Sequence, residues 1–170
     1  MTHVSGLLDE LLEKLRLGDE SLEIEAKRGG KIDTAVLQTV SAFSNEPGRG
    51  GGYILLGVVE EQGTLFGGTY SVAGVANAGK LQADLATRCR NDLSPPVRPT
   101  LTVEIHRSKS VLVVFVPEAA PGDKPVYIRS EGLPHGAYRR IGATDQHCTD
   151  DDMAVLYQSR ATATYDASPV

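Results

Sequence analysis

The fold is most constrained by one apolar run, Tyr53 to Val59, which ends abruptly at Glu60 and Glu61. Residues of this run are apolar on both faces of an extended chain, which is typical of a buried strand. The run has the length of a strand and is far shorter than the ~20 residues of a membrane-spanning helix. A glycine-rich turn, residues 48–52, precedes it. We therefore expect a buried strand in a protein that has no membrane partner.

A second predicted strand lies earlier in the chain, at residues 22–27. Its alternate positions are apolar, so one face packs on a core while the other carries acids and a base. Asp33 is an N-cap candidate for a helix that joins the two strands. The inner stripe of this helix consists of Val36, Leu37, Val40 and Phe43.

The other segments alternate between helical and extended patterns. We expect helices over residues 7–18 and 78–93, a final helix capped by Thr149, and strands over residues 99–106, 110–116, 126–129 and 136–140. These elements predict a single α+β domain with one mixed β-sheet and helices mainly on one side. The expected boundaries are an amphipathic N-terminal helix in residues 1–19, a domain over residues 20–160 and a tail over residues 161–170.

Several short motifs occur in an order that carries a family resemblance. They are Glu20-Ser21-Leu22-Glu23-Ile24-Glu25-Ala26-Lys27, Ser41-Ala42-Phe43-Ser44-Asn45, residues 63–67, Lys124-Pro125-Val126-Tyr127 and Tyr138-Arg139-Arg140-Ile141-Gly142. Together they resemble the Schlafen AlbA_2 family over roughly residues 20–160. In this chain Ala26 stands where the family has an aromatic residue, and residues 46–50 lengthen the turn.

The resemblance implies a nucleic-acid-binding regulatory domain, of the kind found in bacterial transcriptional regulators. Members of the family often carry a further domain, so the resemblance implies that residues 161–170 are a linker to a downstream domain absent from this chain. It also implies a homodimer. The first residues have no basic region followed by an apolar core and a cleavage site, so we expect a cytoplasmic protein.

An alternative function is a metal-dependent endoribonuclease, because some Schlafen proteins use a glutamate pair and a third acid. Glu20 and Glu25 match the first two positions, and Glu60 or Glu61 follows the apolar run. Carboxylates that converge could hold Mg²⁺ or Mn²⁺ as catalytic and metal-binding residues. The competing interpretation is that these acids pair with Lys27 or Arg28. We expect no cofactor and no enzymatic activity unless the nuclease alternative holds.

The charge distribution permits a polyanionic partner. The net charge of -5 arises from the two ends of the chain, and the span from residue 20 to residue 146 is balanced. Lys27, Arg28, Arg49 and Arg140 are the candidate phosphate contacts, and Arg140 is alternatively an internal ion-pair partner of the glutamates. The glycines at 48–52 form either an anion-binding nest or a flexible strand entry. Nucleotide binding is a third possible function, although no P-loop motif follows these glycines.

Overall fold

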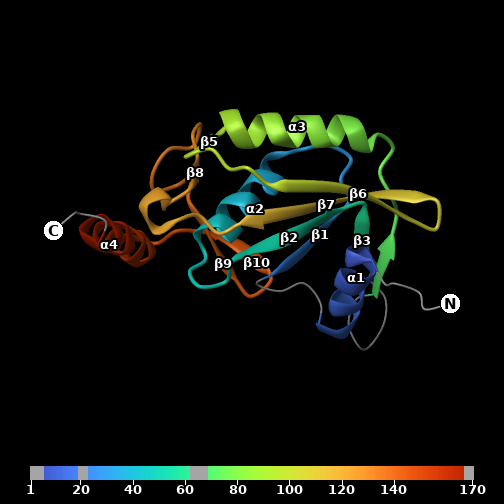
Figure 1. The fold of residues 1–170 in the computed structure, drawn as a ribbon, viewed down its shortest axis with the longest axis horizontal. Coiled ribbons are helices and arrows are strands. Elements are labelled where there is room, and N and C mark those ends of the chain that lie inside the picture. The colour runs from blue at the N-terminus through green and yellow to red at the C-terminus, as the bar shows by residue number, and fades with distance from the viewer. Residues whose placement is uncertain (1–5, 19–22, 62–68, 167–170) are drawn as a thin grey trace.

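The computed structural model describes residues 6–18, 23–61 and 69–166. Its centre is a four-stranded mixed sheet with the order β1-β2-β7-β6 (Figure 1). Strand β1 (Ile24–Lys27) is parallel to β2 (Gly51–Leu56), β7 (Lys109–Pro117) is antiparallel to β2, and β6 (Thr100–His106) is antiparallel to β7. Helix α2 (Thr34–Asn45) makes the crossover that the parallel pair requires.

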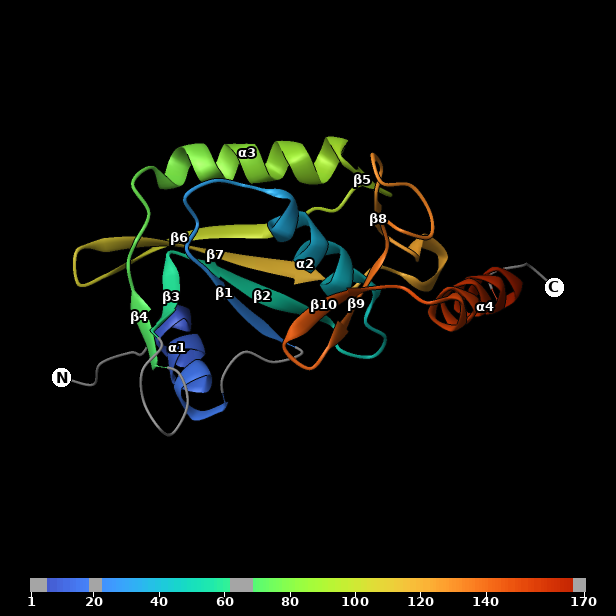
Figure 2. The same cartoon turned by 180° about the vertical axis from the view of Figure 1, so that it is seen from behind.

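Helices cover both faces of this sheet. Ile54 and Leu56 of β2 pack with α2 and with α3 (Ala78–Asn91), whereas Leu55 between them packs with α1 (Leu7–Gly18). Figures 1 and 2 show the sheet between α1 and α2. This arrangement explains why the central run is apolar at every position, and it confirms the predicted α+β fold with a mixed sheet.

The apolar run is divided at Gly57, which corrects the expectation of one uninterrupted strand. Gly57 has a φ of 107°, and its carbonyl accepts hydrogen bonds from the N–H groups of Ala73 and Gly74, both at 2.9 Å. Only glycine adopts this backbone conformation readily. The chain therefore leaves the central sheet after Leu56 and enters a separate hairpin of β3 (Val58–Glu61) and β4 (Thr69–Val72).

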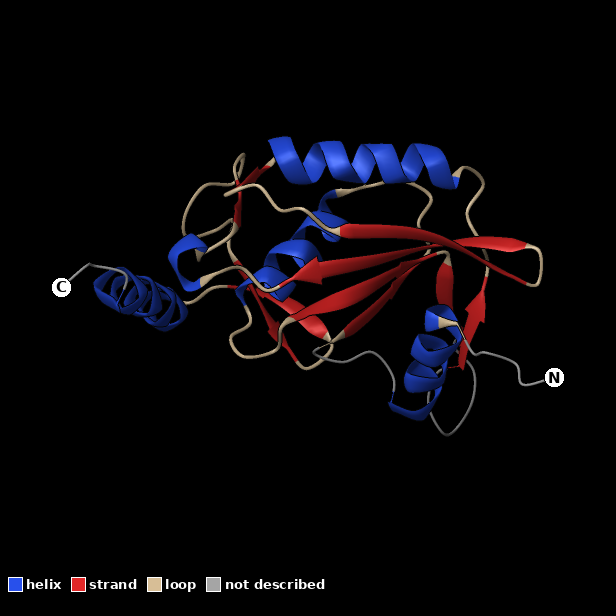
Figure 3. Cartoon of the chain, in the orientation of Figure 1, coloured by secondary structure: helices blue, strands red, loops and turns tan. Residues whose placement is uncertain are grey.

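Two further two-stranded ribbons and a short helix surround the far end of the sheet. They are β5 (Leu93–Ser94) with β8 (Tyr127–Ile128), β9 (Tyr138–Ile141) with β10 (Thr144–His147), and the 3₁₀ helix η1 (Pro121–Asp123). Helix α4 (Asp150–Asp166) follows and lies at the end of the molecule opposite the β6–β7 turn (Figure 3). The helix continues past residue 160, so the expected tail begins inside a helix. No helix in the described ranges is long and apolar enough to cross a membrane.

Candidate nucleic-acid interface

Arg140 on β9 lies at the centre of a buried ionic cluster. Its side chain has none of its surface exposed, and its guanidinium contacts Glu25 Oε2 at 2.5 Å and Asp145 Oδ1 at 2.9 Å. The Thr39 hydroxyl donates to Asp145, and the Phe43 ring lies 5.2 Å from the guanidinium carbon. Burial by itself would lower the pKa of Arg140, but Glu25 and then Asp145 raise it above its usual value. Of the two roles expected for Arg140, the structure shows the internal ion pair.

Arg139, the neighbour of Arg140, points to the other side of the strand and joins three elements. Its Nε contacts Glu46 Oε1 at 2.7 Å, and its Nη1 contacts Asp152 Oδ1 at 3.0 Å. The hydrogen bond with Glu46 is the main reason why the pKa of Arg139 is raised. Since Glu46 follows α2 and Asp152 lies in the first turn of α4, this arginine fixes β9 between two helices.

The Ser41-to-Asn45 motif of α2 performs a structural task. Asn45 Nδ2 donates to the carbonyls of Val126 at 2.9 Å and Tyr138 at 3.0 Å, and Asn45 Oδ1 accepts from the Val126 N–H at 2.7 Å. Ser41 donates to the Val126 carbonyl at 2.8 Å and accepts from the Tyr138 N–H at 3.1 Å. These side chains satisfy buried backbone groups that lack sheet partners. The motif therefore anchors two later segments to α2, as expected of a helix that serves packing.

The glycine-rich turn forms an anion-binding nest that the chain fills with its own carboxylate. Glu118 Oε1 accepts hydrogen bonds from the N–H groups of Arg49 and Gly50, both at 2.9 Å. Its other oxygen contacts Lys124 Nζ at 2.9 Å. Burial alone would raise the pKa of Glu118, but the Gly50 N–H and Lys124 outweigh it and lower the pKa below its usual value. The Arg49 side chain remains exposed, while its backbone is engaged internally.

Only part of the predicted carboxylate site lies within the described residues. Glu20 lies outside the described residues, as do residues 63–67. Glu25 is bound to Arg140 and, at 3.2 Å, to Lys27, whereas Glu60 is exposed on the β3–β4 hairpin opposite Tyr70. Glu61 accepts a hydrogen bond from the Ser71 hydroxyl at 2.8 Å. No group of three His, Cys, Asp or Glu side chains within the described ranges could hold a metal ion. The three-glutamate site stays a prediction.

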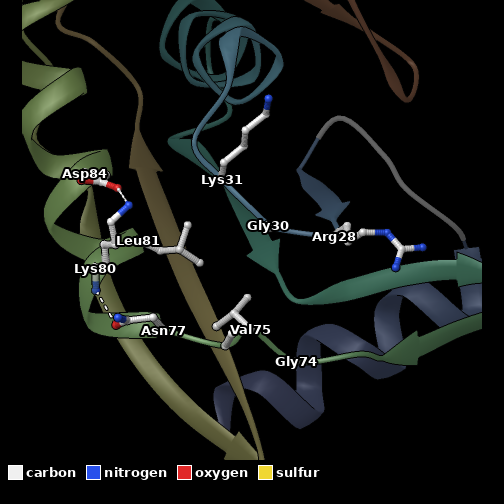
Figure 4. A pocket seen from close by; sticks show the side chains of 11 residues that line it. Arg28, Gly30, Lys31, Gly74, Val75, Asn77, Lys80, Leu81 and Asp84 are labelled. Atoms are coloured by element: carbon white, nitrogen blue, oxygen red, sulfur yellow. Dashed lines mark hydrogen bonds and ion pairs between the residues drawn. The ribbon is translucent and has the colours of Figure 1, made fainter.

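Exposed cations gather where β1 and β2 end and the β6–β7 hairpin turns. A pocket of about 220 Å³ at this end is lined by the loop after β1 and by the first turn of α3, and it includes Arg28, Lys31 and Lys80 (Figure 4). Lys80 is 3.4 Å from Asp84, while Arg28 and Lys31 have no ion-pair partner among the described residues. Figure 4 shows the Arg28 and Lys31 side chains extending away from Lys80. The charges thus surround the pocket and do not converge on one point.

Two more cations, Arg107 and Lys109, lie on the β6–β7 turn, which projects past the first residues of α3 (Figures 1 and 2). Arg107 and Ser108 both have positive φ, which identifies a two-residue hairpin turn of the type that matches strand twist. Lys109 packs beside Gly74, which also lines the pocket, since a Cβ on Gly74 would lie 2.9 Å from the Lys109 Cβ.

We call the five cations Arg28, Lys31, Lys80, Arg107 and Lys109 the basic end. Sequence reasoning identified only Arg28 among them, because they come from separate segments that the fold brings together. The sequence feature that could have indicated the basic end was the Arg107-Ser108-Lys109 turn, which places two cations at the tip of a hairpin.

Lys27, at the end of β1, lies beside the basic end but is paired with Glu25. Arg49 lies at the opposite end of β2, and Arg140 is buried.

The chain is similar to two proteins of known structure. The chain is similar to the N-terminal domain of an ATP-dependent DNA helicase RecG-related protein from Nitrosomonas europaea, with 45% identity, 82% of this chain and 92% of that chain covered, and a TM-score of 0.68. A protein from Corynebacterium diphtheriae shares the fold, with 16% identity, 89% of this chain and 30% of that chain covered, and a TM-score of 0.54. No curated protein matches the chain. The model of the family described as Schlafen, AlbA_2 matches residues 20–149, and the chain belongs to this family.

Proposed function

We propose that this chain is a DNA-binding module that holds the phosphate backbone at its basic end. The observation that carries the proposal is the gathering of five exposed cations around one end of the sheet, two of which, Arg28 and Lys31, have no ion-pair partner among the described residues. The family and the helicase-related neighbour support a nucleic-acid-related role. The name of that neighbour mentions DNA, so we propose DNA as the nucleic acid that this chain binds.

The arrangement of the charges favours a polymer over a single nucleotide. Arg28, Lys31 and Lys80 point in different directions around the pocket. A nucleotide-binding site would need donors aimed at one phosphate chain, together with a P-loop motif that is absent from the sequence. Cations spread over an exposed surface contact successive phosphates instead, which gives binding that depends little on base sequence.

The four phosphate contacts predicted from the sequence take different places in this proposal. Arg28 belongs to the basic end, and Lys27 lies beside it with its ammonium shared by Glu25. Arg49 is exposed at the other end of β2 and remains a candidate for a separate contact. Arg140 is assigned to the internal ion pairs.

The proposed regulatory role and the homodimer follow the family resemblance, and the proposed compartment follows the sequence analysis. We propose a cytoplasmic regulator of transcription that acts as a homodimer. A dimer places two basic ends on one particle, and this adds phosphate contacts that a single module with few cations lacks. Light scattering tests the dimer directly, because a mass that stays near 18.1 kDa at every concentration contradicts it.

Fluorescence anisotropy with labelled oligonucleotides tests the proposed function. At low salt we expect binding to duplex DNA, with similar affinity for unrelated sequences. The experiment includes single-stranded DNA and RNA, which distinguish a general affinity for phosphates from a preference for duplex DNA. Absence of binding to all three nucleic acids would overturn the proposal.

A further inference from the structure

The two edges of the central sheet differ in how they are protected. On the β1 edge, the strand is short, and Arg140 Nη2 donates to the Ile24 carbonyl at 3.4 Å, so the cluster described above bonds to part of this edge. On the β6 edge, no described residue bonds to the outward backbone groups. Natural sheets usually protect such an edge with lysines, prolines or bulges. Between Thr100 and His106 there is no proline, no lysine and only one formally charged residue, Glu104.

The register of the β6–β7 hairpin identifies the outward backbone groups. His106 pairs with Lys109 across the two-residue turn, and in such a hairpin this pair exchanges hydrogen bonds. Hydrogen-bonded pairs then alternate along β6, so the N–H and C=O groups of Leu101, Val103 and Ile105 point away from β7. These groups form a continuous row of donors and acceptors along the edge.

The side chains of the same three residues form an apolar row. Leu101, Val103 and Ile105 share the sheet face on which α3 packs, because their partners in β7 include Val114 and Leu112 of that core. Val103 is 39% exposed and Ile105 is 66% exposed. Leu101 packs partly against the core. The backbone row and the apolar row therefore coincide on an edge that lacks a partner within the described chain.

We propose that this edge pairs with β6 of a second copy of the chain, in antiparallel register, with Val103 on the two-fold axis. This inference rests on the homodimer of the proposed function and names its surface. In this register Leu101 lies opposite Ile105 of the second copy, and Val103 lies opposite Val103 of the second copy. All three outward residues then make hydrogen-bonded pairs, and the exposed apolar side chains cover one another.

The other face of the strand is compatible with the same register. Thr102 lies opposite Glu104 of the second copy, so a hydroxyl donor meets a carboxylate, and no charge directly faces a like charge. Thr100 lies opposite His106 of the second copy. The pairing is self-complementary, as an isologous interface requires. It creates a continuous eight-stranded sheet with the two basic ends at opposite ends.

A pair of cysteine variants tests the register. Val103→Cys places two thiols on the axis, where hydrogen-bonded antiparallel residues have Cα atoms about 5.5 Å apart, within the range of a disulfide. Ile105→Cys is the control, because its site is more exposed but its two copies lie about 14 Å apart in this register. Cys89 and Cys148 are buried, and burial raises the pKa of each to about 12, so they contribute little background.

After mild oxidation we expect Val103→Cys to give at least about tenfold more covalent dimer on a non-reducing gel than Ile105→Cys. Equal cross-linking of both variants, or none with Val103→Cys, would overturn the register. A second experiment needs no oxidation: Val103→Lys and Val103→Glu should each be monomeric in light scattering, and their mixture should form dimers. Ile141→Lys, at a β9 residue that is 51% exposed, should dimerise like the wild type.

The outcomes separate this inference from DNA binding. Cross-linking of Val103→Cys in a protein that binds no nucleic acid would leave the interface intact and overturn the proposed function. DNA binding by a protein whose dimer is unaffected by Val103→Lys would overturn the interface alone. A wild-type protein that is monomeric at every concentration would overturn both the dimer and its surface.

Discussion

The arginines of β9 and the cations of the basic end carry the same charge in opposite environments. Arg140 is fully buried between Glu25 and Asp145, while Arg28 and Lys31 are exposed and lack ion-pair partners among the described residues. A buried charge is balanced by partners within the fold, so its removal affects stability. An exposed charge without a partner contributes little to stability and is free to bind phosphates. The position of a cation in the sequence does not by itself distinguish a buried structural charge from an exposed phosphate contact.

Removal of the buried arginine should have the largest effect. Arg140→Ala leaves Glu25 and Asp145 uncompensated in a mostly buried site, so we expect a loss of about 3 to 5 kcal/mol in the free energy of unfolding. Urea denaturation measures this loss. Arg129→Ala, at an exposed arginine, is the matched control and should change stability by less than about 0.5 kcal/mol. Equal stabilities of the two variants would contradict the structural role of Arg140.

Glu25→Gln removes the charge of one of the acids that pair with Arg140, and it also tests the nuclease alternative. Glutamine cannot balance the Arg140 charge, so we expect a loss of about 1 to 3 kcal/mol in urea denaturation. Since Glu25 is bound to Arg140, wild-type protein with tRNA and Mn²⁺ should show no cleavage. Cleavage by the wild type that disappears in Glu20→Gln and in folded Glu25→Gln would instead establish the carboxylate site.

Loss of the Glu118 charge from its nest should have a smaller effect on stability, and this effect should depend on pH. The pKa of Glu118 is lowered in the folded state, so its ionised form stabilises the fold above the usual glutamate pKa. This stabilisation is lost as the pH falls through the lowered value. Because Glu118 is partly exposed, the wild type should exceed Glu118→Gln in stability by about 1 kcal/mol or less at neutral pH. The difference should shrink toward pH 3 in urea denaturation, and a difference that grows as pH falls would contradict this assignment.

Local patterns predicted the elements of this fold, and distant contacts decided the roles of its charged residues. The Asp33 cap is confirmed, since its carboxylate accepts from the Val36 N–H at 3.2 Å. By contrast, Glu25 and Arg140 are 115 positions apart, and Gly50 and Glu118 are 68 apart. Nothing local in the sequence identifies such partners. The basic end was missed for the same reason, because its cations come from loops and turns whose meeting depends on the whole sheet.

The salt dependence of DNA binding tests the central claim most directly. The variant Arg28→Ala/Lys31→Ala/Lys80→Ala removes three cations of the basic end, and Arg90→Ala is a control at the other end of α3. Each lost phosphate contact should reduce the slope of log K against log salt by about 0.9. We therefore expect the triple variant to lower the slope by about 2 to 3 units, with wild-type stability, and Arg90→Ala to leave it unchanged. A triple variant with the wild-type slope and affinity would contradict the assignment of phosphate binding to the basic end.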